Sequence, residues 1–113
     1  MDIYLDGSLL LTRALPWYLQ DDTHAELYVR RAAVALKAGE HEVALADARE
    51  ALQRDQRHFG ARVIEGTALR ELRRYDEAIA ANESVLAVHP WAPGVVVNIW
   101  KGERAKRILA NQP

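Results

Sequence analysis

The sequence contains no cysteine, so disulfide bonds, thiolate metal sites and a cysteine nucleophile are all excluded. It also lacks a strong charge excess. The formal net charge is −1, which does not favour nucleic acid or an anionic membrane as a partner. Half of the 113 residues are hydrophobic and 27% are charged, which is typical of one small folded domain.

Long hydrophobic runs are scarce as well. The most apolar stretch, SLLLTRALPWYL, is interrupted by Arg13 and Pro16 and is too short to span a bilayer. Asp2 and Asp6 precede it, whereas a signal peptide begins with basic residues. We therefore expect this stretch to belong to the fold, and we expect the chain to be cytoplasmic and not inserted in a membrane.

Motifs for catalysis are absent from the sequence. It has no glycine-rich phosphate loop and no nucleophile elbow. No histidine has an i, i+4 histidine partner, so we expect no metal site; the four are His24, His41, His58 and His89. No basic patch surrounds Trp91 and Trp100, which we interpret as packing residues at the C-terminal cap rather than as a base-stacking platform. We expect no enzymatic activity and no cofactor.

What the sequence does contain is an internal repeat. HEVALADAREALQRDQ (residues 41–56) and YDEAIAANESVLAVHP (residues 75–90) align without a gap, with His41 on Tyr75. The alignment extends over two units, residues 25–58 and 59–92, and places Ala44 on Ala78. The two segments are offset by 34 residues. A period of 34 residues is typical of helical repeats, in which each unit buries its apolar face against the next.

Each unit reads as two amphipathic helices joined by a short turn. The apolar spacing predicts helices at about 23–37, 42–54, 60–72 and 76–87. Thr23 and Glu26 have the spacing of a capping box, and Gly39 can supply a left-handed turn after the first helix. Pro90 ends the second unit, because proline cannot continue a helix.

Over residues 25–90 the chain resembles the tetratricopeptide repeat (TPR) family. The matching positions are Tyr28, Ala32, Ala35, Gly39, Ala44, Ala51 and Leu52 in the first unit, and Gly66, Leu69, Tyr75, Ala78, Val85, Leu86 and Pro90 in the second. Arg31 and Glu65 stand where the family prefers leucine, and Gln56 replaces its usual proline. The resemblance implies an all-α fold with antiparallel helix pairs stacked as a short right-handed TPR solenoid, a single domain over residues 1–113.

The two flanks continue the repeat in phase. We expect residues 93–110 to form a C-terminal capping helix that starts at Pro93, with Val96, Ile99 and Trp100 at the family's inward positions. Residues 8–20, within an N-terminal apolar segment (1–22), stand where the second helix of a preceding unit would fall. Apolar residues cover most of its helical circumference, and the candidates for self-association are Leu11, Leu15, Trp17, Tyr18 and Leu19. Alternatively, Pro16 breaks the segment into two pieces that fold back on the core.

The resemblance implies a concave groove, lined by the first helix of each unit, that binds a peptide. The positions that map to the groove are Glu26, Val29, Arg30, Ala33 and Lys37, then Gly60, Val63, Ile64, Thr67 and Glu71, and on the capping helix Val97, Asn98, Lys101 and Arg104. The small residues among them leave space for a ligand backbone. The basic residues either attract carboxylates or simply keep a helix face soluble.

The two ends of the chain carry opposite charge. The segment 1–22 has four aspartates against one arginine, and the segment 93–113 has four basic residues against one glutamate. This asymmetry favours head-to-tail association or has arisen by chance.

Two functional hypotheses follow from the resemblance. The first is a non-enzymatic adaptor that binds a peptide segment of a partner protein in its groove. The alternative is a small chaperone of a bacterial secretion system that forms a homodimer through its N-terminal segment.

Overall fold

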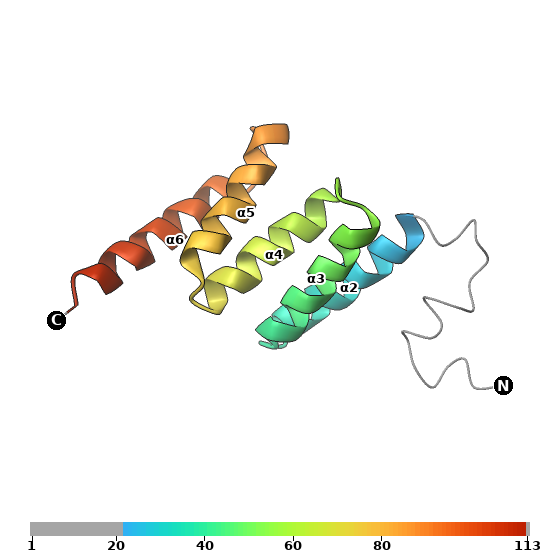
Figure 1. The fold of residues 1–113 in the computed structure, drawn as a ribbon, viewed down its shortest axis with the longest axis horizontal. Helices are drawn as coiled ribbons and strands as arrows, with labels where there is room; N and C mark the ends of the chain where they lie inside the picture. The colour runs from blue at the N-terminus through green and yellow to red at the C-terminus, as the bar shows by residue number, and fades with distance from the viewer. Residues whose placement is uncertain (1–21, 113) are drawn as a thin grey trace.

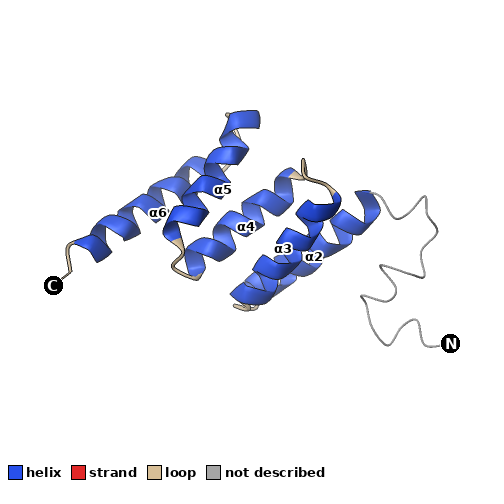
Figure 2. Cartoon of the chain, in the orientation of Figure 1, coloured by secondary structure: helices blue, strands red, loops and turns tan. Residues whose placement is uncertain are grey.

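The structure, a computed structural model, describes residues 22–112. Five α-helices occupy most of this range, and the described residues form no β-strand (Figures 1 and 2). The helices are α2 (Asp22–Lys37), α3 (His41–Arg54), α4 (Phe59–Glu71), α5 (Tyr75–Val88) and α6 (Val95–Ala110). The all-α prediction is therefore confirmed, and the helices of both units begin and end within one residue of the expected positions. The candidate self-association residues, Leu11, Leu15, Trp17, Tyr18 and Leu19, lie outside the described residues.

The helices pack in chain order as a row. Each helix contacts the next one, and α4 also contacts both α2 and α6, so the first helices of successive units are neighbours (Figure 1). As a result α3 packs on both α2 and α4, and α5 packs on both α4 and α6. This arrangement of neighbouring helix pairs is consistent with a helical repeat.

Alanine dominates the interfaces between the helices. Ala44 and Ala78, the small residues that the repeat alignment pairs, have 0% and 2% of their surface exposed. Small side chains at such positions let two helix backbones approach closely. Larger residues fill the space between the crossings, and Leu69 and Val95 are the largest fully buried apolar side chains of the described residues.

Both units end their first helix with the same turn. In the first unit the Gly39 N–H donates to the Leu36 carbonyl at 3.1 Å and the Glu40 N–H donates to the Ala35 carbonyl at 2.9 Å. This pair of bonds is a Schellman motif, and Gly39 has the required positive φ of 80°. In the second unit Arg73 occupies the same position with a φ of 64°.

Arg31 and Glu65, which stand where the repeat pattern favours leucine, each form a charged pair. Arg31 on α2 donates to both carboxylate oxygens of Asp47 on α3, at 3.3 and 3.2 Å. Its counterpart Glu65 on α4 accepts from Arg49 on α3 at 3.3 Å. Each pair joins two neighbouring helices, so a polar contact stands where the repeat pattern favours an apolar one.

Two of the expected helix starts are corrected by the structure. Thr23 already lies inside α2, so it does not stand at the N-cap of a capping box. Likewise α6 begins at Val95, because Gly94 adopts a positive φ of 75° and forms the N-cap. Pro93 therefore precedes the helix instead of opening it.

Candidate peptide-binding surface

The predicted groove positions lie on α2, α4 and α6, the three helices that neighbour one another through α4. The basic side chains on α2 and α6 are exposed: Arg30, Lys37, Lys101 and Arg104. Between them, on α4, Val63 and Ile64 are half-buried. The described residues thus combine a partly apolar middle with cationic side chains on both flanking helices.

Arg30 is held by a network that spans the two units. Glu26 pairs with Arg30 at 3.6 Å and with the His58 Nε2 at 2.8 Å. The His58 Nδ1 accepts the N–H of Ala61 at 3.1 Å and so caps α4. The ring proton therefore lies on Nε2 and is donated to Glu26. This hydrogen bond, with the charge of Arg30, lowers the pKa of the Glu26 carboxyl.

Several predicted groove residues have structural contacts of their own. Val29 is buried in the core with Tyr28 and Ala61, so little of it is available to a ligand. A side chain at Gly60 would meet the His58 ring at 3.2 Å, which means that this space is already filled. The Thr67 hydroxyl donates to the Val63 carbonyl at 2.9 Å. Only part of the predicted surface is therefore open, with Ala33 half-buried beside it.

On α6 the predicted positions are more accessible. Val97 has half of its surface exposed, and Asn98 next to it is half-buried. The Arg104 guanidinium lies 5.3 Å from the centre of the Trp100 ring, in a cation–π contact. Lys101, which follows Trp100 within α6, is also exposed.

A hollow of about 580 Å³ lies at a different place, between the start of α4 and the end of α5. We call it the Phe59 hollow. Phe59 and the His89 ring meet edge to face with centroids 4.9 Å apart, and Val88 is 73% exposed beside them. None of the lining residues is acidic; they are Gln56, Arg57, Phe59, Arg62, Ser84, Val85, Val88 and His89.

The repeat explains why this hollow exists. In the first unit Tyr28 is buried, and the Arg54 guanidinium covers its ring at 4.8 Å. In the second unit the equivalent residues are Arg62 and Val88, which line the hollow instead of filling it. By the repeat alignment, the hollow corresponds to the space that the Tyr28 side chain occupies in the first unit. Sequence reasoning missed it, although the loss of the aromatic at position 62 was a visible signal.

Trp91 corrects an expectation. A second hollow of about 230 Å³ shares Phe59 and Val88 with the first and is also lined by Trp91. Trp91 is 90% exposed, so it is not a packing residue of the cap. Trp100, at 52% exposed, is not buried either.

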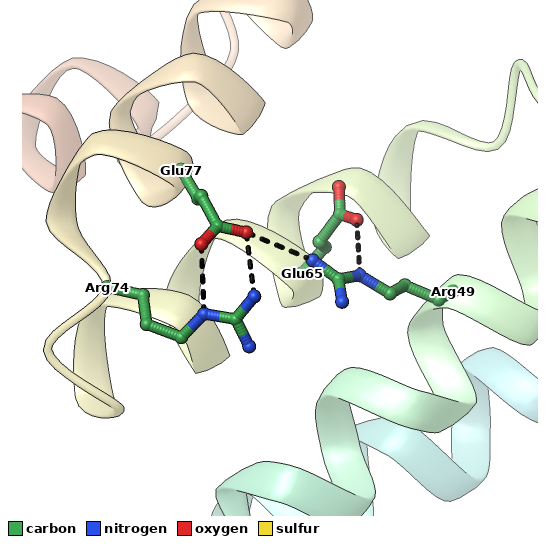
Figure 3. A network of polar contacts seen from close by, with 4 residues as sticks. All are labelled: Arg49, Glu65, Arg74 and Glu77. Atoms are coloured by element: carbon green, nitrogen blue, oxygen red, sulfur yellow. Dashed lines mark hydrogen bonds and ion pairs between the residues drawn. The ribbon is translucent and has the colours of Figure 1, made fainter.

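A polar network joins the second helices to α4 (Figure 3). Arg49 on α3 reaches Glu65 on α4 at 3.3 Å and Glu77 on α5 at 3.5 Å. Arg74 donates two hydrogen bonds to Glu77, at 3.0 and 2.8 Å, and these bonds lower the pKa of the Glu77 carboxyl. Both carboxylates of this network, Glu65 and Glu77, are paired with arginines. The network therefore links neighbouring helices and leaves neither carboxylate unpaired.

No protein-family model and no curated protein sequence matches this chain. Within residues 22–112, no group of three or more histidine or carboxylate side chains is placed to hold a metal ion. Every helix of the described part falls short of the length and hydrophobicity that a bilayer span requires.

Proposed function

We propose that the chain is a non-enzymatic protein-interaction module of the TPR type, which binds a peptide segment of a partner protein along α2, α4 and α6. The observation that carries this proposal is the direct contact of α4 with both α2 and α6. Because of it, equivalent positions of successive units adjoin in space and offer one continuous surface to an extended ligand.

The chemistry of this surface favours a peptide with apolar and acidic side chains. Val63, Ile64 and Val97 supply apolar contacts, and the exposed cations Lys37 and Lys101 flank them. Exposed ammonium groups contribute little stability to a fold but attract carboxylates over several ångströms. A partner segment that alternates apolar and acidic residues would use both.

The experiment has two stages. A random peptide library is first selected against the immobilised full chain, and an enriched peptide is titrated by fluorescence anisotropy. The binding surface is then tested with Arg30→Glu/Lys101→Glu, a double charge reversal on α2 and α6. We expect this variant to lose affinity at least about tenfold, because two attractive charges become repulsive, with an unchanged melting temperature.

The matched control is Arg57→Glu/Arg62→Glu, which reverses two charges at the Phe59 hollow. It should bind the peptide like the parent chain. If the control variant loses binding and the groove variant keeps it, the site is the hollow and the proposed surface is wrong. If library selection enriches no peptide, the proposal that the chain binds peptide segments is contradicted.

A further inference from the structure

The face of α6 that carries Val96 and Trp100 has no neighbouring helix among the described residues. Val96 and Trp100 are 59% and 52% exposed. In the repeat alignment their counterparts are Tyr28 and Ala32 on α2, which are buried under α3. The prediction that Val96 and Trp100 point inward is therefore wrong, because no second helix covers this side of α6 among the described residues; of the three predicted residues, Ile99 is half-buried.

The opposite end of the row shows the complementary gap. Val34 on α2 is 69% exposed, whereas its counterparts Ala68 and Gly102 are buried against α3 and α5 respectively. Among the described residues, no second helix therefore covers α2 on this side, and none covers α6 on the side of Val96 and Trp100. By the same phase, residues 8–20 stand where the second helix of a preceding unit would fall, with Leu10 at the position of Ala44 and Pro16 at the position of Glu50.

We propose that residues 8–20 of one copy dock on the exposed face of α6 of another copy, which completes a helical unit between two chains. In this position the segment lies between α6 of one chain and α2 of its own, as α3 lies between α2 and α4. Both of its sides are then buried. This agrees with its sequence, because a helix that is apolar around its circumference needs neighbours on both sides.

Geometry excludes docking within the same chain. Residue 20 is two residues from Asp22 at the start of α2, a span of at most about 7 Å. Helix α4 lies between α2 and α6 (Figure 1). Two interhelical spacings amount to about 16–20 Å. Residues 8–20 of the same chain therefore cannot reach the α6 face, and the segment that we propose there comes from a second copy.

Charge complementarity supports the pairing. Residues 8–20 are flanked by four aspartates, Asp2, Asp6, Asp21 and Asp22. Close to Val96 and Trp100, α6 carries the exposed Arg104 and Arg107 and one exposed acidic residue, Glu103, which leaves this face with a basic excess. A head-to-tail contact brings these opposite charges together, so that association should weaken as salt is raised. Because such a contact does not close on itself, it produces open chains rather than a fixed dimer.

The test uses light scattering on the full-length chain and on two variants with one damaged end each. The apparent mass of the parent chain should rise with concentration and fall with added salt. Trp100→Asp disables the α6 face, and Leu11→Asp/Leu15→Asp disables the segment, so each variant alone should be a monomer. Mixed in equal amounts, they should form a dimer of twice the 12.7 kDa chain mass and grow no further, since only one complementary pair of ends remains.

Trp91→Asp is the control, because it removes a more exposed tryptophan outside the α6 face. It should assemble like the parent chain. Circular dichroism checks that each variant melts cooperatively, and Val96→Asp replaces any Trp100 variant that does not. A parent chain that stays monomeric at all concentrations overturns the proposal. So does a Trp100→Asp variant that forms dimers alone, because its N-terminal segments would then pair with each other.

Discussion

The two complete units, residues 25–58 and 59–92, have the same helices but solve the same packing problems differently. At the positions that are equivalent to Gly66 and Asn82 in the repeat alignment, the first unit has Ala32 and Ala48, both fully buried. The second unit places Gly66 against Asn82, whose side chain is 1% exposed. A larger residue on one helix is thus matched by a smaller one on the other. The two units therefore keep a similar space between their crossing helices, although the residues that fill it differ.

The largest expected effect comes from destroying a crossing in either unit. Ala44→Arg or Ala78→Arg inserts a long charged side chain at a site with almost no exposed surface. Overpacking together with burial of a charge should cost about 3 kcal/mol or more. Thermal melting by circular dichroism should show loss of the cooperative transition.

The matched controls for those variants are Ala46→Arg and Ala80→Arg. Both positions are exposed, lie on the same helices as the buried alanines and are equivalent to each other in the repeat alignment. They should melt like the parent chain. Cooperative melting of Ala44→Arg or Ala78→Arg at the parent temperature would mean that the units are misaligned.

A second prediction makes the second unit resemble the first. Arg62→Tyr with Val88→Arg should fill the Phe59 hollow as Tyr28 and Arg54 fill the equivalent space. The added apolar burial and cation–π contact should raise the free energy of unfolding by about 1 kcal/mol. Urea denaturation measures this, and the gain should be smaller for either single variant than for the pair. Destabilisation by the pair would show that the hollow is not the vacated aromatic site.

Substitutions in the turns that follow α2 and α4 should change the free energy of unfolding by a smaller amount, with a sign that the backbone φ determines. Arg73 adopts the left-handed conformation that Gly39 adopts in the first unit. Arg73→Gly should stabilise by about 0.5–1 kcal/mol, because glycine tolerates positive φ without a Cβ penalty. Gly39→Ala should destabilise by a similar amount through φ alone, since no atom lies within 4 Å of the added Cβ. Equal stability of all three chains in urea would contradict this difference between the turns.

The smallest effect is a pH dependence that arises near neutral pH from His24 in the first unit. Burial and the nearby charge of Arg54 lower the pKa of His24 below its ordinary value of 6.5. As pH falls below about 6.5, the unfolded chain takes up the proton first, so stability declines with acidification. Glu26, whose pKa is also lowered, adds a further loss below about pH 4.5. His24→Asn should make the melting temperature less dependent on pH between pH 7 and 5. If the melting temperature of this variant falls with pH as steeply as that of the parent chain, the pH dependence comes from other groups.

The helices were predictable from the sequence because the repeat fixes which positions must be small and buried. Ala44 and Ala78 are buried as the alignment requires, and Gly39 turns as expected. Interactions between the units were not predictable. His58, the last residue of the first unit, caps α4 of the second unit and contacts Glu26 on α2, and neither residue has a pattern that reveals its partner.

The exposed tryptophans illustrate a second limit. Periodicity identifies the face of a helix on which Val96 and Trp100 lie, but it does not say whether a neighbour covers that face. Trp91 lies in the loop before α6, where no periodicity applies. For the Phe59 hollow, the alignment of Arg62 with Tyr28 was a visible signal, but it did not show that Arg62 and Val88 leave the space open, which depends on side-chain positions.

The most direct test of the repeat is a double-mutant cycle at the Gly66–Asn82 crossing. A Cβ at Gly66 would lie 2.6 Å from the Asn82 Nδ2, so Gly66→Ala should lose about 1–3 kcal/mol of unfolding free energy. Adding Asn82→Ala recreates the Ala32–Ala48 pair and removes a buried Oδ1 that has no hydrogen-bond partner among the described residues. The double variant should therefore regain at least the parent stability in urea denaturation, with a coupling above about 1 kcal/mol. Additive losses would contradict the equivalence of the two units.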